Sequence, residues 1–230
     1  MVSGYSVAVG YSYDAANPNS YAGTGITINN LSGIGNTGVL TNGPTFSQLN
    51  GGIIYFDGSN DYIQIINEIP PLSTFTIDLW VNSAVPADGH RIIFDGYYTF
   101  RVSIYIGKYM VGAGDGTNWI NFYLYSARNP IYNTWEHICW TWDGSKSKLY
   151  LNGVFEAEQS SAAFSTVTRE IRLAGFVQGG YNWNGKLSTS KIYNRALSST
   201  EVLQNFNATK NRYIKVLPPI ADASLVLNLD

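Results

Sequence analysis

The sequence predicts an all-β fold: a two-sheet antiparallel jelly-roll sandwich with one short helix near the C-terminal end. Three observations predict it. Segments that alternate apolar and polar residues recur about ten residues apart, and turn residues separate them. The composition agrees, because the 230 residues include 17 tyrosines, six tryptophans and 23 glycines, which suit short strands joined by tight turns. A chain of this length can bury a sizeable core in one large domain.

The predicted strands follow one another along most of the chain. The segment 51–66 reads as strand, turn and strand, with residues 57–61 (DGSND) as the turn. In 73–83, every second residue from Phe75 to Val81 is apolar, which is typical of a half-buried strand. The series continues in the segments 91–115, 118–126, 135–144, 147–159 and 169–176.

One helix is predicted in 195–206. Ser198 precedes Glu201 by three residues, which is the spacing of a capping box. Val202, Leu203 and Phe206 then supply an apolar stripe, and the expected helix is two to three turns long.

The chain beyond the helix is predicted to be extended. Pro218 and Pro219 block both a helix and a central strand, and residues 223–230 (ASLVLNLD) form one more strand. The predicted domain organisation is therefore a jelly-roll domain in 1–208, followed in 209–230 by an extended connector and a terminal strand.

Charge and cysteine content exclude several classes of function. The net charge is −2, charged residues make up 13 % of the chain, and no basic run occurs, so nucleic acid is not an expected ligand. The single cysteine excludes an internal disulfide framework and a multi-cysteine zinc site.

No apolar run approaches the roughly 20 residues of a membrane span, so membrane insertion is not expected. The N-terminal segment does not read as a cleaved signal peptide.

The segment 135–142 (WEHICWTW) contains the residues that look most reactive. In a strand, alternate side chains point to opposite faces, so Glu136 cannot orient His137. Cys139 shares a face with His137, but a thiol in mid-strand between tryptophans is more often an inert core residue. No metalloprotease motif, nucleophile elbow or phosphate loop occurs either, and the acidic residues are mostly isolated in turns. We therefore expect a protein that is not an enzyme.

Aromatic and amide side chains in glycine-containing loops are the candidate ligand-binding residues. They occur in 96–100, 116–123 and 179–185, where aromatic faces can stack on sugar rings and amides can bond sugar hydroxyls. The residues predicted to bind a ligand are Tyr98, Asn118, Trp119, Tyr181 and Trp183. The alternative is that these aromatic side chains fill the core and pin the hairpins.

The turn in 57–61 is a candidate calcium loop. Asp57 and Asp61 can offer oxygen ligands, although their spacing is not that of an EF-hand. Asp-Gly turns are also common in hairpins that bind no metal. Calcium is the one cofactor for which the sequence offers candidate ligands.

Four segments in order (55–65, 75–82, 135–153 and 184–208) resemble the concanavalin A-like, laminin-G-like jelly-roll family. The Trp-led strand before Lys148-Leu-Tyr-Leu-Asn-Gly resembles the central hairpin of that family, and 185–202 resembles its last strand and closing helix. The resemblance covers residues 5 to about 207. The sequence differs from the family at Ser188 and Thr189, where members often carry an acidic residue. No role of that acidic residue is therefore expected in this chain. The Glu-x-Asp-x-x-Glu strand of the sandwich glucanases is also absent.

Within this family, the segments 12–25, 31–46 and 201–213 resemble a subgroup found in virion proteins of tailed bacteriophages. In that subgroup the first strand of the domain reads much like 223–230. The resemblance implies that this terminal segment begins a following repeat or is donated as a strand to a neighbour.

The resemblance implies a non-catalytic module on the surface of a virion, in a capsid or tail decoration or fibre protein. Such a module would make weak, multivalent contacts with host-surface carbohydrate. Its expected partners are other virion proteins, copies of itself and a cell-surface glycan. One alternative is a purely structural cement or fibre protein that assembles through its terminal strand. Another is a glycan-active enzyme or its ancillary domain. The expected location is the particle surface, with a secreted or cell-surface bacterial protein as the alternative.

Overall fold

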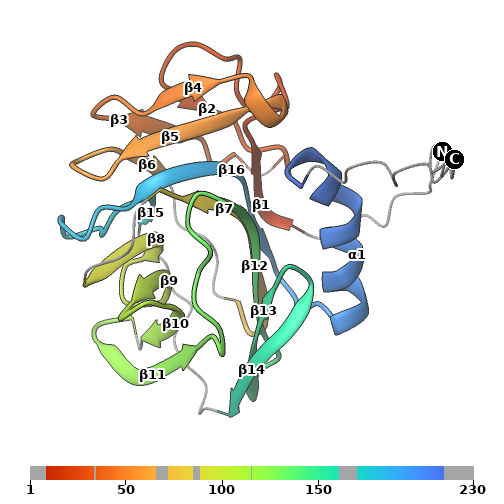
Figure 1. Cartoon of the computed structure of the whole chain (residues 1–230). Coiled ribbons are helices and arrows are strands. Elements are labelled where there is room, and N and C mark those ends of the chain that lie inside the picture. Colours follow the sequence, from red (N-terminus) through yellow and green to blue (C-terminus); the bar gives the residue numbers. More distant parts are fainter. Residues whose placement is uncertain are drawn as a thin grey trace, which may run out of the picture.

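Two antiparallel sheets form the protein. The computed structural model describes residues 9–33, 35–65, 72–84, 89–114, 116–160 and 170–214 (Figure 1). In these ranges, sixteen strands divide into two sheets of eight, with one α-helix beside the first sheet. The predicted terminal strand in 223–230 and the two prolines of the connector lie outside the described residues. The predicted sandwich with one short helix is confirmed.

The first sheet has the strand order β14-β13-β12-β7-β16-β5-β4, and β1 pairs with β16 beside this path. The bounds of its strands are β1 Val9–Asp14, β4 Thr45–Ser47, β5 Ile53–Asp57, β7 Phe75–Ser83, β12 Trp135–Trp142, β13 Lys146–Leu151, β14 Val154–Ser160 and β16 Asn184–Tyr193. A short 3₁₀ turn, η1 (Leu49–Gly51), precedes β5.

The second sheet has the strand order β11-β10-β9-β8-β15-β6-β3-β2. Its strands are β2 Thr27–Ile28, β3 Gly38–Thr41, β6 Tyr62–Ile65, β8 His90–Gly96, β9 Phe100–Tyr105, β10 Lys108–Gly114, β11 Trp119–Tyr125 and β15 Ile171–Leu173. Consecutive strands β8 to β11 form a meander at one end of this sheet, and this meander carries the site described below.

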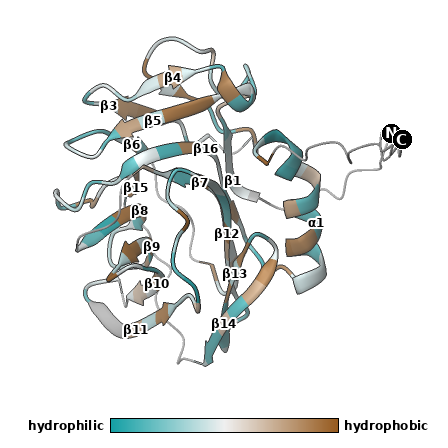
Figure 2. Cartoon of the chain, viewed as in Figure 1, coloured by the Kyte–Doolittle hydropathy of each residue, from teal (hydrophilic) through white to brown (hydrophobic). Residues whose placement is uncertain are grey.

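The main core lies between the two sheets, and strand parity decides which residues enter it. In β12, Ile138, Trp140 and Trp142 face the core, whereas Cys139 and Trp135 belong to smaller clusters on the outer face. The two faces predicted for this strand are therefore confirmed. Apolar stretches recur on the strands of both sheets and are separated by hydrophilic turns (Figure 2). Burial of this apolar surface is the main force that holds the two sheets together.

Helix α1 (Ser199–Thr209) covers the outer face of the first sheet beside β12 and β16 (Figure 1). The predicted capping box is present: the Ser198 hydroxyl accepts a bond from the Glu201 N–H, and the Glu201 carboxylate accepts one from the Ser198 N–H. Val202 is fully buried, but Leu203 is 44 % exposed, so the predicted apolar stripe is only partly buried.

Regular structure continues past residue 208, where the predicted jelly-roll domain ends. Thr209 completes α1, and a 3₁₀ turn, η2 (Lys210–Arg212), follows it. Arg212 reaches back to the start of the domain, where its guanidinium contacts the Asp14 carboxylate at 2.7 Å and the Asn50 carbonyl at 2.8 Å. Arg212 therefore packs against the sandwich, and the division of the chain at residue 208 remains a prediction.

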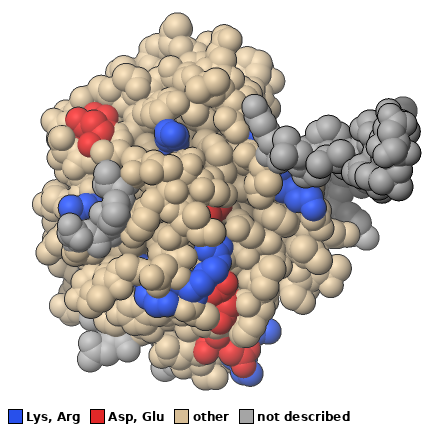
Figure 3. Space-filling view, in the orientation of Figure 1, with Lys and Arg blue, Asp and Glu red and all other residues tan. Residues whose placement is uncertain are grey.

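Few charged side chains lie on the face of the molecule shown in Figure 3, where the largest group of basic side chains adjoins acidic ones. Of the helices in the described ranges, none has the length and apolar character needed to cross a membrane.

Candidate functional site

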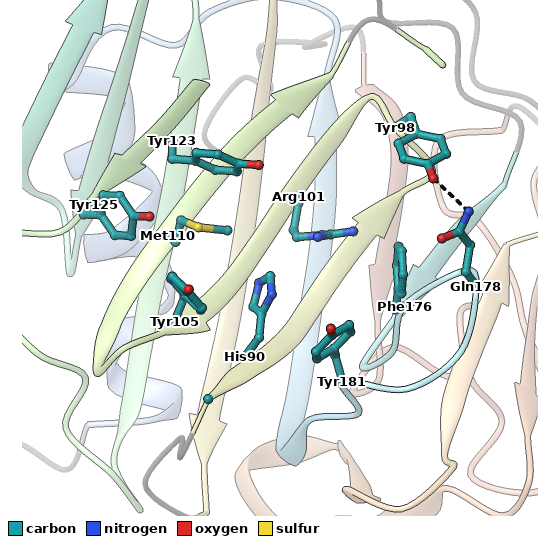
Figure 4. A pocket seen from close by; sticks show the side chains of 11 residues that line it. His90, Tyr98, Arg101, Tyr105, Met110, Tyr123, Tyr125, Phe176, Gln178 and Tyr181 are labelled. Carbon is teal, nitrogen blue, oxygen red and sulfur yellow. Dashed lines mark hydrogen bonds between the residues drawn. The ribbon is translucent and has the colours of Figure 1, made fainter. Parts of the chain in front are cut away.

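A pocket of about 750 Å³ opens on the outer face of the β8–β11 meander (Figure 4). The strands supply its floor: His90, Arg101, Tyr105, Met110, Tyr123 and Tyr125. The loops beside it supply Tyr98, Phe176, Gln178 and Tyr181. Five of these residues are tyrosines, and we call this cavity the tyrosine pocket. Among the described residues that line it, none is Asp, Glu or Lys.

Strand alternation places these side chains on the outer face. In β9, Val102 and Ile104 enter the core, so Arg101 and Tyr105 point outward. The antiparallel register then brings residues from separate strands together, since Met110 lies opposite Tyr125. The floor is thus assembled from four neighbouring strands.

Gly112 shapes the floor by its lack of a side chain. It lies opposite Tyr123, and a Cβ atom at this position would stand 3.0 Å from Cδ1 of the Tyr123 ring. A glycine within a strand often marks such a close approach. Here it lets the tyrosine ring lie across the strand.

Arg101 and Asp95 form a buried ion pair beneath the pocket. They lie opposite each other in β9 and β8, and Nε and Nη2 of Arg101 each stand 2.8 Å from Oδ1 of Asp95. Asp95 also accepts a bond from the Val177 N–H at 3.1 Å, and the Arg101 guanidinium lies 4.6 Å from the centre of the Phe176 ring. Burial raises the pKa of Asp95, although the charge of Arg101 opposes that shift. The pair fastens the 176–181 loop to the sheet and balances the charge of the arginine.

His90 lies between two tyrosine rings. Its ring centre is 5.0 Å from that of Tyr105 and 5.3 Å from that of Tyr181, and Nε2 lies 3.0 Å from the Ser103 hydroxyl. Burial, together with the positive charge of Arg101, lowers the pKa of His90 to about 4. The imidazole is therefore neutral at neutral pH.

Two loop tyrosines adopt a backbone conformation that is rare for residues with side chains. Tyr98 and Tyr181 have φ angles of 56° and 52°. Hydrogen bonds hold them, because the Tyr181 carbonyl accepts from the Ile92 N–H and the Tyr98 carbonyl accepts from the Gly116 N–H, both at 2.9 Å. The Gln178 amide donates to the Tyr98 hydroxyl at 2.9 Å and joins the two loops (Figure 4). Strained residues held in this way are common at binding sites.

The structure brings two of the five predicted ligand residues, Tyr98 and Tyr181, to the tyrosine pocket. Asn118 is exposed in the turn before β11 and is not among the residues that line the pocket. Trp119 begins β11, but its side chain lies outside the part of the chain that the structure describes. Ligand binding by any of these residues remains a prediction.

The structure places the side chain of Trp183, the fifth predicted ligand residue, in the core. Trp183 is 2 % exposed, its ring centre lies 6.0 Å from that of Phe56, and its Nε1 donates to the Ser83 hydroxyl at 3.0 Å. A Cβ atom on Gly185 would fall 2.3 Å from the Trp183 ring. The neighbouring glycine thus reflects close packing of the indole, not exposure in a turn.

Five strand residues of the pocket were not predicted from the sequence: His90, Arg101, Tyr105, Tyr123 and Tyr125. The sequence contained a signal for an outward-facing aromatic surface. Each of these tyrosines stands at a position that alternates with the apolar, core-facing residues of its strand. The sequence did not show which strands pair, so it could not show that these positions share one surface.

The histidine and cysteine of β12 have no catalytic geometry. Cys139 is fully buried, and this burial, with the nearby Asp78 carboxylate, raises the pKa of its thiol well above the usual value. His137 is also buried, with Nε2 3.0 Å from Oδ2 of Asp78. A neutral, inaccessible thiol is not a nucleophile, which agrees with the structural interpretation of this segment.

The candidate calcium residues hold their own turn. Oδ1 of Asp57 accepts a bond from the Ser59 N–H at 2.7 Å, and Oδ2 of Asp61 accepts one from the Asp57 N–H at 3.1 Å. Within the described ranges, no three His, Cys, Asp or Glu side chains are grouped so that they could hold a metal ion. Calcium binding by Asp57 and Asp61 remains a prediction.

Residues 57–203 match the family model of the concanavalin A-like lectin/glucanases superfamily. The chain belongs to this superfamily. The match includes the β8–β11 meander and the 176–181 loop, so the tyrosine pocket lies within the family domain. None of the curated proteins compared with the chain matches it significantly.

Solved structures with this superfamily fold include several toxin binding domains. The botulinum neurotoxin type G receptor binding domain is 16 % identical with a TM-score of 0.68, and the alignment covers 87 % of this chain and 51 % of that one. The binding domain of paraclostridial mosquitocidal protein 1 is 19 % identical with a TM-score of 0.70 and coverages of 89 % and 53 %. The botulinum neurotoxin DC binding domain, solved in complex with SialylT, is 12 % identical with a TM-score of 0.68 and coverages of 89 % and 52 %. The chain therefore spans about half the length of each of these binding domains.

Proposed function

We propose that this domain is a non-catalytic carbohydrate-binding module whose ligand occupies the tyrosine pocket. The observation that carries the proposal is the cavity of about 750 Å³ with five tyrosines, one phenylalanine and a few polar groups around it. Its volume lies in the range of ligand pockets, roughly 300–1,000 Å³. Aromatic rings give flat apolar surfaces for sugar rings, and tyrosine hydroxyls bond sugar hydroxyls.

The side chains of the pocket support binding rather than hydrolysis. Glycoside hydrolases typically place two carboxyl groups across the scissile bond. No Asp or Glu is among the described residues that line the tyrosine pocket. Asp95 lies beneath it, fully buried and paired with Arg101. Glu136 is buried on the opposite face of β12 from His137 and accepts a bond from the Tyr109 hydroxyl at 2.9 Å.

The comparisons support the same class of function. The superfamily is named for lectins as well as glucanases. The similar solved structures are described as receptor binding or binding domains, and one was solved in complex with SialylT. A role in recognition on a cell surface follows from the proposal.

A glycan array probed with multimerised protein tests the proposal, because multivalency makes weak binding measurable. We expect signal above background on one class of glycan. Tyr181→Ala should reduce it, since Tyr181 is 51 % exposed and lines the pocket. Phe155→Ala is the matched control, because Phe155 is also 51 % exposed but lies on β14 of the first sheet. An array with no signal, or equal losses in the two variants, would contradict the proposal.

We further propose that the module works on the surface of a virus particle, where many copies would act together. This context rests on the resemblance of 12–25, 31–46 and 201–213 to phage virion proteins. Mass spectrometry of purified particles tests it, and we expect peptides of this chain at a stoichiometry of many copies per particle. Its recovery only from culture supernatant or cell envelopes would favour a secreted or cell-surface protein instead.

A further inference from the structure

The tyrosine pocket carries no uncompensated charge near neutral pH. Its described ionisable lining groups, apart from the tyrosines, are Arg101 and His90. The Arg101 guanidinium is balanced by Asp95, with two N···O distances of 2.8 Å, and Asp95 is fully buried behind it. His90 is neutral because its pKa is about 4.

This balance disfavours an acidic ligand. A sugar carboxylate or sulfate entering the pocket would lose hydration and would meet only an arginine that is already paired. It would have to compete with Asp95, which additionally holds the Val177 N–H. Neutral sugar hydroxyls donate and accept hydrogen bonds, as do the tyrosine hydroxyls around them.

The aromatic residues of the pocket form two groups. The strand-side group consists of Tyr105, Tyr123 and Tyr125, and the loop-side group consists of Tyr98, Phe176 and Tyr181. Figure 4 shows the two groups on opposite sides of the cavity, with His90 and Arg101 between them. Each group can stack against one sugar ring, while the polar residues between them face the linkage.

We propose that the tyrosine pocket binds uncharged oligosaccharides through two subsites, one at each aromatic group. This inference rests on the proposed function and names the class of glycan that the pocket takes. The strand-side subsite contacts one sugar unit and the loop-side subsite contacts the next. An acidic substituent is tolerated only where it lies outside the cavity.

Isothermal titration with a matched set of glycans tests both parts of the inference. The set contains a neutral oligosaccharide selected on the array, its constituent monosaccharides, and the same oligosaccharide carrying a carboxylate or sulfate on an internal unit. We expect the neutral oligosaccharide to bind about tenfold more tightly than any monosaccharide and than the acidic form. Tyr125→Ala and Tyr181→Ala, one from each group, should each weaken oligosaccharide binding about three- to tenfold.

Asp95→Asn tests the role of charge directly. The substitution removes the anion that balances Arg101, so the acidic glycan should gain affinity relative to the neutral one by about tenfold. Where this variant does not fold, the comparison of neutral and acidic glycans on the unaltered protein decides the question.

The outcomes separate this inference from the proposed function. Preferred binding of the acidic form would overturn the inference but leave a carbohydrate-binding module. Equal affinity for monosaccharide and oligosaccharide would overturn the two subsites. Absence of binding to any glycan would overturn the proposed function, and the inference with it.

Discussion

Nε2 of His137 lies 3.0 Å from Oδ2 of Asp78, and both side chains are buried beneath helix α1. Asn205 of the helix donates to the same carboxylate oxygen at 3.4 Å, and Phe206 packs with its ring centre 5.9 Å from that of His137. Burial alone would raise the pKa of Asp78, but the charges of His137 and Lys191 and the hydrogen bonds of His137 and Asn205 hold it below the usual value. This polar cluster joins two strands of the first sheet to the helix.

Loss of the Asp78 carboxylate should destabilise the domain strongly. Asp78→Ala leaves His137 buried without its partner, so we expect the free energy of unfolding to fall by about 3–5 kcal/mol. Asp78→Asn keeps one acceptor and should cost about 1–3 kcal/mol. Urea unfolding followed by tryptophan fluorescence measures both. Glu158→Ala is the control, since its pair with Lys146 is exposed and contributes less than about 1 kcal/mol; equal losses at Asp78 and Glu158 would contradict the prediction.

His90 should make stability depend on pH in a defined window. Its pKa is about 4 in the folded protein against a usual value of 6.5. Between these values the unfolded chain binds more protons, so the free energy of unfolding decreases as pH falls from about 6.5 to about 4. The groups that face the ring are Arg101, Tyr105, Tyr181 and Ser103.

His90→Gln removes this proton uptake, so the melting temperature of the variant should fall less than that of the unaltered protein between pH 7.5 and pH 4.5. Differential scanning fluorimetry at the two pH values gives the comparison. Parallel slopes for the two proteins would show that His90 does not titrate in this window.

A methyl group at Gly112 should change binding without removing any polar group. The Cβ atom of Gly112→Ala would press on the Tyr123 ring from 3.0 Å and shift it from its position in the floor of the pocket. We expect affinity for the array-selected glycan to fall about three- to tenfold, with a change in unfolding free energy below about 1 kcal/mol. Titration calorimetry and urea unfolding measure the two quantities. Gly35→Ala is the control, because a Cβ there meets nothing within 4 Å; unchanged affinity in Gly112→Ala would show that the ring orientation is immaterial.

Substitutions at Trp183 and Tyr181 should distinguish a residue that stabilises the core from a residue that contacts the ligand. Trp183→Ala removes a fully packed indole and should cost about 3–5 kcal/mol of stability. Tyr181→Ala truncates a half-exposed ring and should cost less than about 1 kcal/mol while it weakens glycan binding. Thermal unfolding of the two variants gives the contrast. A stable Trp183→Ala protein that fails to bind glycan would contradict the core role and support Trp183 as a ligand residue.

Much of the fold could be predicted because its signals are local. Alternation in 75–81 indicated which side chains of β7 enter the main core, and the capping-box spacing of Ser198 and Glu201 located the start of α1. The contact between Arg212 and Asp14 was not predicted, because it joins residues 198 positions apart and leaves no local pattern. Glycines near turns pointed to Tyr98 and Tyr181, which line the pocket. They also pointed to Trp183, which is buried and whose neighbouring glycine makes room for the ring.

By itself, the sequence determined the class of fold, the inward and outward faces of the strands, and the helix with its cap. Periodicity, turn residues and capping act over a few residues, so they can be read along the chain. Only the tertiary structure decided that the strand tyrosines and the loop tyrosines meet around one cavity, namely Tyr105, Tyr123, Tyr125, Tyr98 and Tyr181. It also decided that Asp95 neutralises Arg101 at the floor of this cavity. The reason is that strand register and loop packing juxtapose residues that are distant in sequence, and these contacts form only when the sheets assemble.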